Sequence, residues 1–242
     1  MNEALVFVRS LLFAVIQAAL TVVFGVLSLG TIVLPPFGRY RFIALWSRIV
    51  LWFAHHLCGV RYRVTGADHL PTEPCIVLCK HQSAWETLAL QSILPPQVWV
   101  LKRELLRVPF FGWGLAMLSP IAIDRSAGRQ ALKQMVVQGK QRLGMGFWIV
   151  MYPEGTRVPP GQRGQYHIGG AWLATQTGAK VVPIAHNAGT VWPRNAFLKR
   201  PGTITVTIGP TIDPTGMKPE ALRLQVEEWI ETEVARLGSA RA

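Results

Sequence analysis

The hydrophobic positions divide this chain into an apolar N-terminal part and a body of mixed pattern. From Leu11 to Leu34 there are 24 consecutive residues without a charge, closed by Pro35 and Pro36. At a rise of ~1.5 Å per residue, this run predicts a helix of about 36 Å, enough to cross a bilayer core of ~30 Å. A cleaved signal peptide fits poorly, because the run is too long, its start is not basic and no small-residue cleavage site follows.

A second apolar stretch, Phe42 to His56, contains Trp46 but also Arg48. It is too short to span a bilayer alone, and its pattern is typical of an interfacial helix among lipid headgroups. Two arrangements remain open, a spanning helix followed by an interfacial one, or a re-entrant pair in one leaflet. A pair of buried core helices is a third interpretation, which the long uncharged run disfavours.

Basic residues are distributed unevenly around the first apolar segment. Arg39, Arg41 and Arg48 follow it, and only Arg9 precedes it. Because positively charged flanks stay on the cytoplasmic side, this asymmetry predicts that the bulk of the protein faces the cytoplasm.

After His56 the pattern changes to short strands alternating with helices. Seven segments, often β-branched and bounded by Gly, Pro or charge, predict strands at Arg61–Val64, Cys75–Cys79, Val98–Leu101, Ile121–Ile123, Phe147–Met151, Val181–Ala185 and Thr203–Ile208. Helical patterns lie at Ala84–Ser92, Glu104–Met117, Gly128–Leu143, Gly170–Thr177 and Pro219–Leu237. The sequence therefore predicts an α/β domain over 59–242, with a mostly parallel central sheet flanked by helices, after N-terminal membrane-anchoring helices over 1–58.

Charge and cysteine content narrow the possible partners. The formal net charge is +12, which implies nucleic acid, phosphate-bearing small molecules or an anionic membrane surface. Acidic residues gather near the C-terminus, at Glu220, Glu227, Glu228, Glu231 and Glu233. The three cysteines, Cys58, Cys75 and Cys79, show no metal-binding spacing and favour small core residues in a reduced compartment.

One group of candidate catalytic residues follows the predicted strand Cys75–Cys79. His81 would lie in the loop at the carboxyl edge of the sheet, and Glu86 in the first turn of the next helix. A carboxylate that accepts the Nδ1 proton leaves Nε2 facing a substrate, where the imidazole can act as a general base for a hydroxyl. The alternative is structural, since Ser83-x-x-Glu86 is itself a capping box.

A second group follows the predicted strand Phe147–Met151. Gly155 allows close approach of backbone to a ligand, Thr156 can donate a hydrogen bond, and Arg157 can form a bidentate pair with phosphate. Glu154 could position Arg157 or a polar group of an acceptor. An ordinary turn with a solvated arginine is the alternative, and the spacing is not that of a P-loop.

Two more cations are candidates to bind a phosphate group. Asp124 and Arg125 end the strand Ile121–Ile123, and Arg125 would approach the edge that carries His81 and Arg157. Lys102 precedes an aromatic cluster, a combination that suits a phosphate headgroup beside an acyl chain. A surface Asp–Arg pair and a core helix with a basic rim are the alternatives.

Taken in order, these segments resemble the glycerolipid acyltransferase superfamily, most closely the bacterial 1-acylglycerol-3-phosphate acyltransferases. The family's His-x4-Asp block is filled by His81 and Glu86, with Glu in place of Asp. The blocks Ile-Asp-Arg, Phe-Pro-Glu-Gly-Thr-Arg and Val-Pro-Ile match Ile123–Arg125, Tyr152–Arg157 and Val182–Ile184, with Tyr for Phe. The resemblance covers about Arg61 to Pro210, and an N-terminal hydrophobic anchor also fits.

The resemblance implies direct acyl transfer from acyl-CoA or acyl carrier protein to the free sn-2 hydroxyl of 1-acyl-sn-glycerol-3-phosphate (lysophosphatidic acid). The product would be phosphatidic acid, in phospholipid biosynthesis at the cytoplasmic face of a bacterial inner membrane. His81 and Glu86 would be catalytic. The residues expected to bind substrate are Glu154, Gly155, Thr156, Arg157, Arg125 and Lys102. No acyl-enzyme, cofactor or metal is expected, since the chain has no Gly-x-Ser-x-Gly elbow and no metal-ligand spacing.

Other functions remain open at this point. The same chemistry could serve glycerol-3-phosphate, another lysophospholipid or an acylated amino-acid lipid. A non-catalytic membrane protein could use the basic body to bind anionic lipid or nucleic acid. Nucleic acid is not expected as a partner, because basic motifs interleaved with aromatic residues are not evident.

Overall fold

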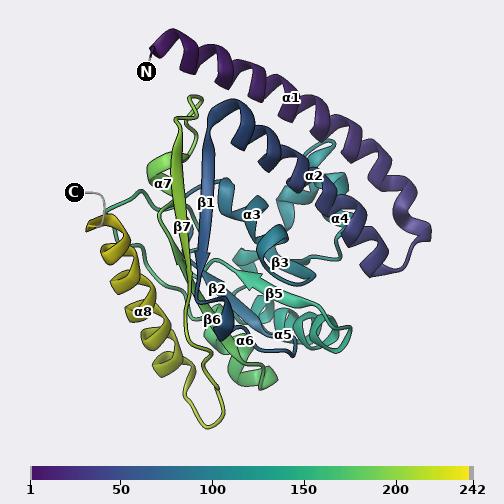
Figure 1. Ribbon diagram of the computed structural model, residues 1–242. Coiled ribbons are helices and arrows are strands. Elements are labelled where there is room, and N and C mark those ends of the chain that lie inside the picture. The colour runs from purple at the N-terminus through teal and green to yellow at the C-terminus, as the bar shows by residue number, and fades with distance from the viewer. Residues whose placement is uncertain (1, 240–242) are drawn as a thin grey trace.

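Seven strands form one sheet in the computed structural model, which describes residues 2–239 (Figure 1). Their order across the sheet is β1-β7-β6-β2-β5-β3-β4. The strands are β1 Val60–Thr65, β2 Ile76–Cys79, β3 Gln97–Lys102, β4 Ile121–Ile123, β5 Trp148–Met151, β6 Val181–His186 and β7 Gly202–Ile208. Strands β6, β2, β5, β3 and β4 are parallel, whereas β7 runs antiparallel to β6 and pairs with β1 in parallel. The predicted α/β fold with a mostly parallel sheet is confirmed.

Helices cover the sheet, and the central strands are therefore apolar throughout. Every residue of β2, β5 and β6 is buried, as expected for parallel strands packed on both faces. The helices of the body are α3 Trp85–Ile93, α4 Phe111–Met117, α5 Gly128–Gly144, α6 Gly169–Thr177, α7 Ala188–Val191 and α8 Pro219–Ser239. Helix α6 packs between α5 and α8, and α8 also packs on β6. The predicted C-terminal amphipathic helix is confirmed, with Leu222, Val226 and Ile230 buried.

Two long helices form an N-terminal hairpin along one side of the body (Figure 1). Helix α1 spans Glu3–Gly30 and continues as a 3-10 turn to Val33, and α2 spans Pro36–Cys58. Helix α2 is longer than predicted, because Pro36 is well suited to a first helical turn and Gly59, at φ 69°, ends the helix in the left-handed conformation. It is also more than an interfacial helix, since residues such as Tyr40 and Val50 are buried in the core.

Helix α1 keeps most of its apolar surface outside the protein. Within the part of the chain that the structure describes, one stretch, Glu3–Val33, is long and apolar enough to cross a membrane, and 17% of its apolar window is buried. It is therefore not a core helix. At Gly25, α1 approaches α4 so closely that a Cβ atom would lie 2.5 Å from the Phe110 carbonyl oxygen.

The predicted helix Glu104–Met117 is wrong in its first half. The chain instead forms a 3-10 helix, Arg103–Arg107, and begins α4 at Phe111. Pro109 explains the break, since it has no N–H and disfavours helical geometry at Val108. The break directs this segment toward α1, which packs on α4.

Candidate active site

His81 and Glu86 form a close pair at the carboxyl end of β2. The chain leaves this central strand at Cys79 and turns into α3 at Trp85, which brings the two side chains together. His81 Nδ1 lies 2.7 Å from Glu86 Oε1. The His81 side chain is 13% exposed and that of Glu86 is 1% exposed. Since Nδ1 faces the carboxylate, the tautomer that donates from Nδ1 has its free acceptor at Nε2.

The carboxylate of Glu86 also closes the N-terminus of α3. The same Oε1 atom accepts the backbone N–H groups of Gln82 at 3.0 Å and Ser83 at 2.9 Å. Ser83 Oγ accepts the N–H of Trp85 at 3.1 Å. Capping and orientation of His81 therefore occur together, and neither interpretation of the sequence excludes the other. Burial opposes the charged form, but the facing His186 and His81 imidazoles and the Ser83 N–H outweigh it and lower the pKa of Glu86.

Tyr152 supports the imidazole from the neighbouring strand. Its ring stacks on that of His81, with centroids 4.0 Å apart and planes 15° from parallel. Tyr152 is the first residue after β5, which pairs directly with β2. With Glu86 on its edge and Tyr152 on its face, the His81 ring is fixed in two directions.

Hydrogen bonds tie the Tyr152–Arg157 loop and the adjoining Val158 to the His81 loop. Arg157 Nε donates to the Ser83 carbonyl at 2.7 Å, and the N–H of Val158 donates to the His81 carbonyl at 2.8 Å. Gly155, at φ 66°, adopts the left-handed turn that the loop requires. The structure thus brings the two predicted groups of residues together at adjacent strand ends.

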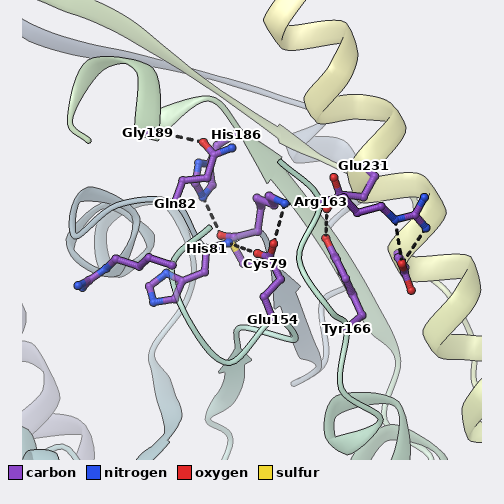
Figure 2. A network of polar contacts seen from close by, with 12 residues as sticks. Cys79, His81, Gln82, Glu154, Arg163, Tyr166, His186, Gly189 and Glu231 are labelled. Atoms are coloured by element: carbon purple, nitrogen blue, oxygen red, sulfur yellow. Dashed lines mark hydrogen bonds and ion pairs between the residues drawn. The ribbon is translucent and has the colours of Figure 1, made fainter. Parts of the chain in front are cut away.

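The carboxylate of Glu154 points into the protein. Glu154 is 3% exposed; Oε1 accepts from Lys80 Nζ at 2.7 Å, and Oε2 accepts the backbone N–H of His81 at 2.9 Å. Burial raises the pKa of Glu154, and the bonds from Lys80 and His81 oppose that rise. Figure 2 shows Glu154 beside His81, with dashed lines from its carboxylate.

A cavity of about 720 Å³ opens beside His81. Its polar lining includes His81, Gly155, Thr156, Arg157, Lys102 and Arg194. Its apolar lining comes from α1, α2, α3, β3 and α4, with side chains such as Phe24, Trp46, Leu88, Leu101, Phe111 and Leu115. A cavity with cationic groups and an imidazole at one part and an apolar interior suits an amphipathic substrate.

Lys102 and Arg125 are the two remaining predicted cations, and the structure describes the side chain of Lys102 alone. Lys102 lines the cavity and forms an exposed ion pair of 3.5 Å with Glu104. The backbone of Arg125 follows β4 at the same edge of the sheet, with β3 between β4 and β5. The side chain of Arg125 lies outside the described residues. Asp124 Oδ1 accepts from the N–H and the hydroxyl of Ser126 and so caps the next turn.

Comparisons with known proteins show the family of this chain. Residues 61–187, more than half of the chain, match the family profile described as "Acyltransferase". The 1-acyl-sn-glycerol-3-phosphate acyltransferase of Pseudomonas aeruginosa is 46% identical over 235 residues, which are 95% of this chain and 91% of that protein. The chain belongs to the acyltransferase family. It is an enzyme of the group whose relatives are named 1-acyl-sn-glycerol-3-phosphate acyltransferases, as the sequence predicts.

A more distant relative and a solved structure are also similar to this acyltransferase. The mouse 1-acyl-sn-glycerol-3-phosphate acyltransferase alpha is 30% identical over 182 residues, covering 72% of this chain and 62% of that protein. The crystal structure of the 1-acyl-sn-glycerophosphate acyltransferase PlsC from Thermotoga maritima has a TM-score of 0.79 at 23% identity, with 98% of each chain covered. The latter shows that the whole fold is shared, including the N-terminal helices.

Sequence reasoning missed four residues of this acyltransferase site. Arg194 lines the cavity and donates to the Arg157 carbonyl at 3.1 Å. Lys80 and His186 lie beside His81, and Glu231 reaches Lys80 from α8. The sequence offers one signal for these residues, namely Lys80 directly after a wholly apolar strand. A charge in that position needs a buried partner of opposite charge. In residues 2–239 no group of three or more His, Cys, Asp or Glu residues is arranged to hold a metal.

Proposed function

We propose that this acyltransferase moves a fatty acyl group from acyl-CoA or acyl carrier protein to the sn-2 hydroxyl of 1-acyl-sn-glycerol-3-phosphate. The product is phosphatidic acid, an intermediate of phospholipid biosynthesis. The observation that carries the proposal is the His81–Glu86 pair at 2.7 Å, set at a cavity that is cationic on one part and apolar within. The names of the relatives support the choice of acceptor.

His81 acts as the general base in this proposal. Its Nε2 accepts the proton of the glycerol hydroxyl while the hydroxyl oxygen attacks the thioester carbonyl. The tetrahedral intermediate then breaks its C–S bond, the new ester forms, and the departing thiolate takes the proton from the imidazolium. Glu86 holds Nδ1–H and stabilises the positive charge on His81 between these two proton transfers.

Arg157 is the main candidate to hold the acceptor phosphate. The Ser83 carbonyl fixes its Nε, so the terminal nitrogens of the guanidinium are placed for a phosphate at the cavity. Lys102 adds a second cation from the end of β3, and Gly155 and Thr156 add polar groups of the same loop. Arg125 completes the proposed set from the end of β4.

The apolar cavity and α1 give the lipid substrate an environment of matching polarity. An acyl chain that leaves the bilayer costs ~0.8 kcal/mol per exposed CH₂, which burial in the cavity avoids. The outer face of α1 exposes apolar side chains such as Phe7, Val15 and Val26. This face would enter the cytoplasmic leaflet of the bacterial inner membrane, with the sheet on the cytoplasmic side.

An acceptor panel tests the proposal. The purified full chain, in phosphatidylglycerol–phosphatidylethanolamine vesicles, receives long-chain acyl-CoA or acyl carrier protein and one acceptor at a time. The acceptors are 1-acyl-glycerol-3-phosphate, glycerol-3-phosphate and 1-acyl-glycerophosphocholine, and products are measured by mass spectrometry. Phosphatidic acid should form fastest. Preference for another acceptor overturns the assignment, and no transfer to any acceptor with either donor overturns acyl transfer itself.

A further inference from the structure

A buried ion triad lies behind the His81 loop. The Lys80 side chain is fully buried, and its Nζ lies 2.7 Å from both Glu154 Oε1 and Glu231 Oε1. Figure 2 shows Glu231, on α8, on one side of this network, and Glu154 and His81 on the other. The triad carries one positive and two negative formal charges, and Glu231 lies 151 residues after Lys80.

The α8 end of the triad is held by a second donor. Tyr166 Oη donates to Glu231 Oε1 at 2.7 Å, the same oxygen that accepts from Lys80. The Glu231 side chain is 15% exposed. One turn earlier on α8, Glu227 forms a separate ion pair with Arg163. A single oxygen of Glu231 therefore fixes both the ammonium of Lys80 and the phenol of Tyr166.

The Lys80–His81 peptide is hydrogen-bonded at both its N–H and its carbonyl group. Glu154 Oε2 accepts the N–H of His81 at 2.9 Å. His186 Nε2 lies 2.8 Å from the Lys80 carbonyl, and His186 Nδ1 accepts the N–H of Ala188 at 3.1 Å. This pattern fits a neutral His186 that donates from Nε2, since burial lowers the pKa of His186. The peptide that carries the catalytic imidazole is thus held by the triad on one side and by β6 on the other.

We propose that Lys80, Glu231 and Tyr166 are positioning residues for His81, so that the C-terminal helix α8 is part of the active-site scaffold. Buried ion pairs often stabilise a fold less than apolar side chains of the same volume would. Stabilisation of the fold therefore does not explain why this buried ion triad is present. Each link instead fixes the next, from Tyr166 through Glu231 and Lys80 to Glu154, whose Oε1 accepts from Lys80 and whose Oε2 accepts the N–H of His81. The inference depends on the proposed role of His81 as the base.

Substitutions at Glu231 test this inference. Glu231→Ala leaves Lys80 with one carboxylate and Tyr166 without its acceptor, so kcat should fall about tenfold, since a ~1 Å misplacement of a catalytic group can cost 10²-fold. The KM for acceptor and donor should stay within about twofold, because none of the three triad residues lines the cavity. Glu231→Gln should recover most of kcat, because one amide oxygen can accept both bonds. Glu228→Ala, an exposed change on the same helix, should have no effect.

Hydrogen exchange by mass spectrometry separates positioning from a general loss of stability. In Glu231→Ala, residues 80–84 should exchange faster while β7 keeps its wild-type rate. Tyr166→Phe, which keeps every charge of the triad, should lower kcat about threefold and serves if Glu231→Ala does not fold. If Glu231→Ala and Tyr166→Phe both keep the wild-type kcat and the wild-type exchange rates, the inference is overturned. It is also overturned if the loss of kcat is proportional to the loss of folded protein and Glu231→Gln does not restore kcat. An inactive wild type overturns the proposed function instead, and the exchange result then stands by itself.

Discussion

Arg157 Nε donates to the backbone carbonyl of Ser83 at 2.7 Å, which joins the two loops that carry the site. Ser83 lies two residues after His81, and its own N–H is bound by Glu86. The proposed phosphate-binding arginine and the proposed base are therefore held in one hydrogen-bonded unit across β2 and β5. In the proposed function, this unit sets the spacing between the group that binds the acceptor phosphate and the base that receives the proton of the acceptor hydroxyl.

Arg157→Lys should weaken binding of the acceptor more than it slows the chemistry. A lysine has one ammonium and cannot donate to Ser83 and form a bidentate pair with phosphate at once. The KM for 1-acyl-glycerol-3-phosphate should rise about tenfold or more, and kcat should change less. Steady-state kinetics over a range of acceptor concentrations measure both. Arg129→Lys, on the exposed surface of α5, is the matched control, and an unchanged acceptor KM in Arg157→Lys would remove Arg157 from the phosphate site.

Glu86 should not tolerate replacement by aspartate. In Glu86→Asp the shorter arm cannot keep one oxygen on His81 Nδ1 and on the N–H groups of Gln82 and Ser83 together. We expect kcat to fall about tenfold in Glu86→Asp and about 10²-fold in Glu86→Gln, which also loses the charge that faces the imidazolium. If Glu86→Asp is as active as wild type, the His81 loop adjusts to the shorter side chain, and the length of the side chain at position 86 is unimportant.

The lowered pKa of Glu86 predicts a pH dependence of stability. A carboxyl group with a folded-state pKa below its unfolded value of 4.5 stabilises the protein above that value and loses this contribution as pH falls through the folded pKa. The melting temperature of wild type should therefore exceed that of Glu86→Gln by a constant margin near neutral pH, and the margin should shrink below pH 4.5. Thermal denaturation from pH 3.5 to 7.5 measures it. A margin that grows toward acid would contradict the direction of the shift.

The outer face of α1 should control membrane attachment. Val15 is 59% exposed on this face, and an aspartate there would have to enter the apolar part of the leaflet, a large cost for a charge. Val15→Asp should move a substantial share of the protein from vesicle-bound to free in a flotation assay. Val137→Asp on α5, where the valine is 70% exposed, introduces the same charge away from α1 and should leave binding unchanged. Equal binding by both variants would contradict attachment through this face.

Most of the fold could be predicted because burial imposes a pattern on local sequence. All seven strands were found within about two residues of their ends, since short apolar runs bounded by Gly, Pro or charge have few other uses in an α/β domain. The break at Pro109 was missed because apolar periodicity continued through it. The predicted range of the second helix is too short at its start. Residues Pro36–Arg41 are rich in polar side chains, although α2 runs through them.

The site could be predicted only where its residues are neighbours in sequence or match a known motif. His81 and Glu86 are five residues apart, and the strand order brings Arg157 beside them. The link from Lys80 to Glu231 depends on where α8 packs, which no local pattern encodes. Glu154 is predicted to bind substrate because it belongs to the Tyr152–Arg157 block, whereas in the structure its carboxylate is directed inward to Lys80.

The central claim is that His81 removes the proton from the acceptor hydroxyl. Its most direct test is the rate of phosphatidic acid formation from 1-acyl-glycerol-3-phosphate and long-chain acyl-CoA by wild type and His81→Ala, on vesicles with equal amounts of bound, folded protein. General-base catalysis typically contributes ~10²–10⁴-fold, so we predict a rate loss of that size with vesicle binding intact. A His81→Ala enzyme within about threefold of wild type would contradict the mechanism.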